Sequence, residues 1–143
     1  MNVLEIPFVQ KVGLTRSHEG HLALNMDKSN ENHLQTVHAS AQFTLAETTS
    51  GEALQQLFPH LVGKVVPILR ASEVKFKKPA TGDIYGVARI DDATKGAFEE
   101  QLAKKGRASI SVDVEIKDSH EVLTCLGRFE WFVQKINEKE EEK

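Results

Sequence analysis

The sequence predicts an α+β fold, in which one long helix is accompanied by an antiparallel sheet. Residues 32–58 combine a polar loop with a helical spacing of apolar residues, and no other stretch has a helical pattern as long. The segments that follow alternate apolar and polar residues and are separated by short turns, as antiparallel strands are. Because helix and strands are segregated along the chain, the pattern is typical of the α+β class.

The apolar residues of this helix lie on two of its sides, which predicts a helix buried in the core rather than one lying on it. Ala41 and Leu45 fall nearly opposite the main stripe, and Ser50 falls in the middle of the stripe. Small residues such as those of 48–51 are poor helix formers, but they let a sheet or a ligand approach the backbone closely. The apolar stripe consists of Ala39, Phe43, Ala46, Ala53, Leu54 and Leu57.

Glu47 lies at the margin of the apolar stripe, where an unpaired carboxylate is costly to bury. One interpretation is that it reaches solvent or pairs with a base such as Arg70, since charged residues are seldom buried alone. The other is that it is a general base or nucleophile held in a pocket, with a pKa raised by loss of hydration.

Length and composition indicate one soluble cytoplasmic domain. The chain has 143 residues, the length of one ordinary domain. Its net charge of −3 does not suggest binding to nucleic acid through bulk positive charge. Its single cysteine, Cys125, excludes an internal disulfide and fits a reducing compartment. We see no membrane span and no signal peptide. Residues 1–137 are predicted to form the domain, and the charged residues 138–143 a disordered tail.

The first 26 residues are predicted to hold a short docking helix, a loop and one strand. Residues 1–10 suit a helix interrupted near Pro7, and residues 12–20 a loop. The sequence His18-Glu19-Gly20-His21 in that loop lacks the spacing and the supporting ligands of a metal site, so no metal is expected. Residues 22–26 alternate as a strand.

Four more strands are predicted after the helix, at about residues 64–77, 84–90, 108–117 and 123–133. Pro67 restricts the first of these to an edge or to a bulge. Arg70 shares a face with Val74 unless that strand is irregular near it. Residues 91–105 form a connection that suits a short amphipathic helix through Phe98 and Leu102.

Five strands curled around one helix leave an edge that needs covering or pairing. Pairing with a second copy would remove one edge, so the sequence predicts a homodimer with a continuous sheet, extended in one alternative to a dimer of dimers.

The element order and one motif resemble the hotdog fold, specifically the phenylacetyl-CoA type of acyl-CoA thioesterase and related thioesterase-like domains. The family has an Asn, then six residues later a His followed by two small residues, then nine residues after the His an acid. Here these are Asn32, His38-Ala39-Ser40 and Glu47. Residues 76–83 also resemble the family's turn, and the resemblance spans residues 20–133.

The resemblance implies an acyl-CoA thioesterase for small or medium acyl groups, acting at a dimer interface without a bound cofactor. Backbone N–H groups at Ala39 and Ser40 would form half of an oxyanion hole, since the first turn of a helix leaves its donors unsatisfied. Glu47 of the partner's helix would activate a water or attack the carbonyl. Asn32 would hold the water or the thioester, and His38 would shape and cap the loop.

Lys75, Lys77 and Lys78 are the candidate contacts for the phosphates of coenzyme A, although such a triplet is also common on a solvated face. Departures from the family pattern at Gln35, Ala39 and Leu69 favour an alternative, a binding module for acyl ligands that has lost turnover. A hydratase on the same fold is a third alternative, but the Asp and His pairing of those enzymes is not visible.

Overall fold

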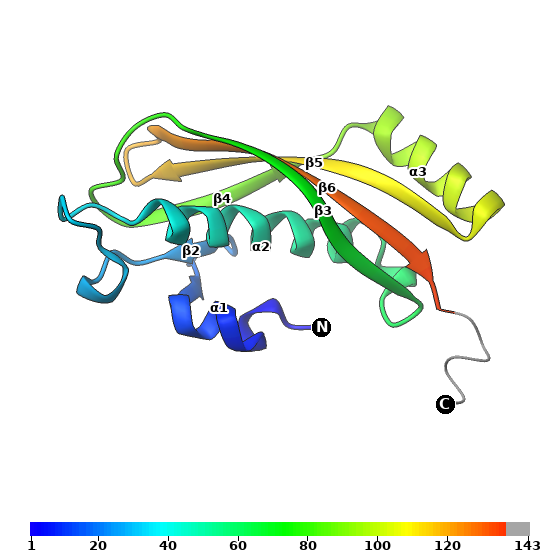
Figure 1. Ribbon diagram of the computed structural model, residues 1–143, viewed down its shortest axis with the longest axis horizontal. Coiled ribbons are helices and arrows are strands. Elements are labelled where there is room, and N and C mark those ends of the chain that lie inside the picture. The colour runs from blue at the N-terminus through cyan, green and yellow to red at the C-terminus, as the bar shows by residue number, and fades with distance from the viewer. Residues whose placement is uncertain (137–143) are drawn as a thin grey trace.

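The computed structural model describes residues 1–136 and has the α+β hotdog fold that the sequence predicted. An antiparallel sheet curves over the central helix α2, and the short helix α1 lies on the other side of α2 (Figure 1). None of the helices in this part of the chain has the length and apolar character needed to cross a membrane. The tail expected at residues 138–143 lies outside the described residues. The elements are α1 (Pro7–Val12), β1 (Leu14–Arg16), β2 (Leu22–Leu24), α2 (Ala39–Leu57), β3 (Val65–Phe76), β4 (Ile84–Arg89), α3 (Asp92–Lys105), β5 (Arg107–Asp118) and β6 (Leu123–Lys135).

The sheet has six strands in the order β1-β2-β4-β5-β6-β3, one more than the sequence predicted. The additional strand is β1, which lies where we expected a loop at residues 12–20. It has only three residues and one buried side chain, Leu14, so its sequence carries no alternation to detect. Pairing with β2 forms it, and Arg16 ties it to α2 through two hydrogen bonds to Glu52, of 2.7 and 3.0 Å.

The connection between β4 and β5 forms α3, a helix of 14 residues that is longer than the short one expected. The Asp91 side chain caps its first turn, and Gly106, with a φ of 73°, ends it. Phe98 and Leu102 are its buried residues, as predicted. The Phe98 ring lies 4.9 Å from that of Phe58, so α3 closes the end of the sheet near the C-terminus of α2.

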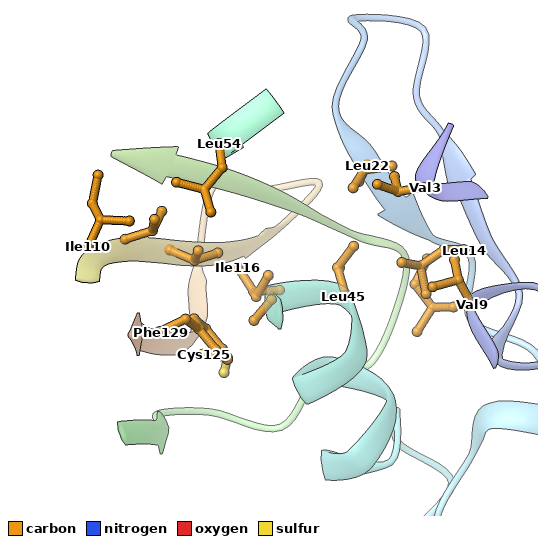
Figure 2. Close-up of a cluster of buried hydrophobic side chains, with 14 of the residues drawn as sticks. Val3, Val9, Leu14, Leu22, Leu45, Leu54, Ile110, Ile116, Cys125 and Phe129 are labelled. Carbon is orange, nitrogen blue, oxygen red and sulfur yellow. The ribbon is translucent and has the colours of Figure 1, made fainter. Parts of the chain in front are cut away.

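The N-terminal segment docks on α2. The sequence predicted a docking helix interrupted near Pro7, whereas the helix begins at that proline. A single turn at Val3–Glu5 precedes α1, which begins at Pro7 because proline is tolerated in the first turn of a helix. Val3 and Val9 are buried. Figure 2 shows them beside Leu14 and Leu22, opposite a second group of buried side chains from β5 and β6, with α2 between the two groups.

The first half of α2 is buried on both sides, which confirms the two-sided apolar pattern. Ala41, Leu45 and Ala46 are all at most 7 % exposed. Small side chains bring the helix close to the sheet: Thr49 packs directly against Gly86 of β4, and a Cβ added at Gly86 would lie 3.1 Å from the Thr49 Cβ. The predicted close approach between helix and sheet is therefore present.

Strand β3 lies at the edge of the sheet, as Pro67 predicted. Its register with β6 shifts between Leu69 and Ala71, so the irregularity falls at Arg70 and not at Pro67. The shift turns Arg70 to the outer face of the sheet, where its guanidinium lies 3.9 Å from the centre of the Phe132 ring.

We expect Gly86→Ala to lower the free energy of unfolding by roughly 1–3 kcal/mol, because the new methyl group must displace Thr49 and with it α2. Chemical denaturation measures the change. Gly96→Ala on the exposed face of α3, where nothing lies within 4 Å, is the matched control, and it should stabilise the protein by ~1 kcal/mol. A Gly86→Ala protein as stable as the wild type would contradict the packing account.

Candidate functional site

The N-terminus of α2 is capped by His38, which confirms the capping role predicted for this histidine. The backbone N–H of Ser40 donates to the His38 Nδ1 at 3.0 Å. The N–H groups of Ala41 and Gln42 donate to the His38 carbonyl oxygen. The imidazole of His38 thus satisfies the Ser40 N–H, one of the backbone donors in the first turn that lack a partner within the helix, and so fixes where α2 begins.

The cap leaves one of the two predicted oxyanion donors free. Ser40 donates to His38, whereas the Ala39 N–H has no acceptor among residues 1–136. Both residues are exposed in the single chain. A ligand oxygen can therefore approach the positive end of the helix dipole at Ala39 without breaking the cap.

Asn32 organises the loop that leads into α2. Its Oδ1 accepts from the N–H groups of Leu34 and Thr36 at 2.9 and 3.1 Å, and its Nδ2 donates to the Thr36 Oγ1 at 2.8 Å. The Asn32 side chain thus acts first as a loop clamp, and only the second proton of its amide is left to reach a ligand.

Gln35 in this loop adopts a φ of +58°, in the left-handed region that favours glycine. This is the position where the resembling family commonly has glycine. The hydrogen bond from the Gln35 N–H to the Asn32 carbonyl oxygen, at 3.1 Å, closes the turn that requires this conformation. The turn is retained here at the cost of a strained glutamine.

Glu47 is half-buried, and burial raises the pKa of its carboxyl. The proposed pairing with Arg70 does not occur, because that arginine stacks on Phe132 on the outer face of the sheet. No other basic side chain in the described part of the chain forms an ion pair with Glu47. Glu47 is therefore a half-buried carboxylate with no ion-pair partner among the described residues.

Glu47 opens into an apolar groove of about 440 Å³ along one side of α2. Gly51 and Leu54 of α2, together with Trp131 of β6, line the groove beyond it. The N-terminal segment forms the opposite wall through Val3 and Phe8. Glu47 carries the single charged side chain among the described residues of this lining.

A hydrogen-bond chain holds the turn of α2 that carries Glu47. The Trp131 Nε1 donates to the Ser50 Oγ at 2.9 Å, and this hydroxyl donates to the Glu47 carbonyl oxygen at 2.6 Å. The helical spacing placed Ser50 in the apolar stripe of α2, but nothing in the sequence indicated its contact with Trp131. The lining by residues 3–9 was also missed, because docking of that segment depends on tertiary contacts alone.

Lys75, Lys77 and Lys78 are exposed at the end of β3 and just beyond it. The chain then passes the start of α2, since the Val37 N–H donates to the carbonyl oxygen of Ala80 at 2.8 Å. The structure thus brings the lysine segment beside the capped helix end. Within residues 1–136, His, Cys, Asp and Glu side chains form no group of three or more that could hold a metal ion.

Glu47 and Ala39 of one chain are too far apart to contact the same carbonyl group. Eight residues of helix separate them, which corresponds to about 12 Å along the axis. A glutamate side chain cannot span that distance. A site that uses both groups needs the Ala39 of one copy and the Glu47 of another.

Comparison with known proteins supports a thioesterase-like hotdog family. A family model described as "Domain of unknown function (DUF4442)" matches residues 5–133. No curated protein matches the sequence. The structure is similar to that of PA5026 from Pseudomonas aeruginosa, described as a protein of unknown function and "Probable Thioesterase". The two share 27 % identity and a TM-score of 0.77, over 94 % of this chain and 91 % of that one.

Two more distant structures share the fold. The thioesterase HI1161 of Haemophilus influenzae has 14 % identity and a TM-score of 0.71, over 95 % of this chain and 88 % of that one. The protein BH2602 of Bacillus halodurans, whose crystal structure contains CoA, has 18 % identity and a TM-score of 0.66, over 85 % of this chain and 72 % of that one.

We expect Gln35→Gly to raise the free energy of unfolding by about 0.5–1 kcal/mol, because glycine adopts a positive φ without a Cβ clash. Thermal denaturation measures the change. Gln10→Gly in α1 is the control and should destabilise the protein, since glycine is a poor helix residue where φ is negative. If Gln35→Gly destabilises the protein equally, the loop does not store the strain described here.

Proposed function

The chain belongs to the family described as Domain of unknown function (DUF4442), and from that premise we propose that it is a thioester hydrolase acting on acyl-CoA at a homodimer interface. The observation that carries the proposal is Glu47, a half-buried carboxylate with a raised pKa at one end of an apolar groove. A base in this setting is weakly hydrated and has a higher proton affinity than an exposed glutamate.

In the proposed reaction, the Glu47 carboxylate takes a proton from a water molecule while the water oxygen attacks the thioester carbon. Negative charge develops on the carbonyl oxygen, which accepts a hydrogen bond from the Ala39 N–H at the positive end of α2. The C–S bond then breaks, and the departing thiolate of coenzyme A takes the proton from Glu47. The products are a carboxylic acid and free coenzyme A. Direct attack by Glu47 on the thioester carbon is the alternative first step.

The second copy of the chain supplies the missing half of the site. The distance of about 12 Å between Ala39 and Glu47 within one chain supports a site shared between two helices. Strand β3 supports edge-to-edge pairing, since its outer edge has no partner among the described residues and it exposes Val66 and Ile68. In a continuous sheet through two β3 strands, these side chains lie beside side chains of the partner's β3.

The coenzyme A portion of the substrate lies, in this proposal, at the lysine segment beside the helix start. Lys77 and Lys78 precede the stretch that hydrogen-bonds Val37, so their ammonium groups can meet phosphates outside the capped helix end. This places the polar part of the substrate at the surface, while its thioester reaches Ala39.

A binding module without turnover is the second candidate. The observation that favours it is the engagement of the Ser40 N–H by His38, which leaves Ala39 as the one free donor of the predicted pair. Loss of an oxyanion donor typically costs about 3–4 kcal/mol of transition-state stabilisation. Binding of an intact acyl-CoA without its hydrolysis would identify this candidate.

We expect Glu47→Gln to lower kcat for acyl-CoA hydrolysis by about 100-fold or more, since glutamine keeps the size of the side chain and cannot accept the proton. Steady-state rates of thiol release measure the loss. Glu99→Gln on the exposed face of α3 is the matched control, and its kcat should be that of the wild type. Equal rates for Glu47→Gln and the wild type would exclude Glu47 as the base.

The same substitution has a pH signature that also tests whether the protein remains folded. Because burial raises the Glu47 pKa, the ionised carboxylate destabilises the folded state above that pKa, and the penalty disappears as pH falls and the group takes up a proton. Glu47→Gln should therefore raise Tm at neutral pH and leave it unchanged in acid. A lower Tm at neutral pH would mean that the carboxylate is structurally required.

We expect Ile68→Lys to convert the dimer to a monomer and to abolish hydrolysis, because a lysine on an edge strand opposes pairing with a second copy. Sedimentation velocity measures the mass. Thr15→Lys on β1, the opposite edge of the sheet, is the control and should remain dimeric. A monomeric wild type that hydrolyses thioesters would overturn the shared site.

A further inference from the structure

The groove beside Glu47 has the shape and chemistry of a site for an unbranched alkyl chain. The residues of α2 that line it run from Glu47 to Gln55, and the C-cap Phe58 follows them, so the groove follows the helix axis. Trp131 and Val133 of β6, Val65 of β3 and Ile6 of the N-terminal segment complete an almost wholly apolar lining. An occupant that follows α2 away from Glu47 therefore meets mostly hydrocarbon. The polar groups there are the Thr48 side chain and the N-terminal ammonium of Met1, which donates to the Gln55 Oε1 at 2.9 Å.

The lining includes an aromatic pair at the C-terminal end of α2. Phe58 and Phe98 both line it, each is 2 % exposed, and their ring centres lie 4.9 Å apart. Phe98 comes from α3, so this end is formed where α3 packs against the end of α2. A chain that enters at Glu47 meets this pair after eleven residues of helix, or about 16 Å.

We propose that the groove binds straight-chain aliphatic acyl groups of up to about 13 carbons, with the thioester at Glu47 and the methyl end at Phe58 and Phe98. The length follows from about 16 Å of groove and ~1.2 Å per carbon, since an extended peptide residue spans ~3.5 Å over three backbone bonds. This inference rests on the proposed thioesterase function, which it deepens by naming the substrate class.

Gly51 is the specificity-determining residue in this proposal. It lies four residues, or about 6 Å, beyond Glu47, and a Cβ there would lie 3.3 Å from the Trp131 ring. Gly51 and Trp131 both line the groove, so a side chain at this position has to displace the ring or extend into the groove itself. A leucine at this position would fill the groove after about five carbons of an acyl chain.

The test measures kcat/KM for acyl-CoA thioesters of 4 to 16 carbons. For the wild type we expect a rise of about fourfold for each added methylene, ending near 13 carbons. For Gly51→Leu we expect the ratio of kcat/KM for dodecanoyl-CoA to that for butanoyl-CoA to fall by at least about 100-fold, because the methylenes beyond the block remain in water. An unchanged ratio would overturn the proposal.

Gly96→Leu on α3 is the matched control, because it makes the same change in a helix where nothing lies within 4 Å. It should leave the chain-length ratio as in the wild type. Gly51→Ala is a second test in case the Gly51→Leu protein does not fold, because alanine is favourable in a helix interior. We expect it to lower the same ratio several-fold, and circular dichroism verifies that each variant is folded.

Binding of thioethers, S-dodecyl-CoA and S-butyl-CoA, separates this proposal from the proposed function, because a thioether cannot be hydrolysed. Tight binding of S-dodecyl-CoA that Gly51→Leu abolishes supports the groove even if no thioester is turned over. Hydrolysis that is insensitive to both chain length and Gly51→Leu supports the thioesterase and overturns the groove. The proposal is also overturned if the wild type binds S-dodecyl-CoA no more tightly than S-butyl-CoA. That result is expected if a second copy of the chain fills the groove.

Discussion

The close packing of α2 against the concave face of the sheet is the constraint on which the rest of the structure depends. Thr49 packs directly on Gly86, and Gly51 lies against the Trp131 ring. These contacts need small residues, so the helix contains a run of poor helix formers that only tertiary packing can hold in place. Gly51 and Trp131 also line the groove, so this close contact helps to set its shape.

In the proposed site, the residue that destabilises the fold is also the proposed base. Burial of Glu47 without a partner among the described residues opposes folding, and it is also what raises the proton affinity of the carboxylate. The hydrogen bonds from Trp131 to Ser50 and from Ser50 to the Glu47 carbonyl oxygen fix the backbone of the turn that carries this side chain. At the start of α2, the left-handed conformation of Gln35 shapes the preceding loop, and the His38 cap fixes where the helix begins.

Several elements could be predicted because their sequences carry a local signal. The alternation in β5 and the two-sided pattern of α2 specify a strand and a buried helix. The spacing from Asn32 through His38 to Glu47 indicated the family. Strand β1 and the length of α3 were not predictable, since three residues cannot show alternation and α3 has a buried side chain only at Phe98 and Leu102.

The sequence by itself determined the fold class, the order of the principal strands along the chain, the restriction of β3 to an edge or a bulge, and the histidine that caps α2. These follow from side-chain periodicity, from proline geometry and from local capping, all of which act over a few residues. Only the tertiary structure decided that Arg70 turns away from Glu47 and that residues 3–9 wall the groove. Such contacts join segments distant in the chain, and their energies depend on packing that no local pattern encodes.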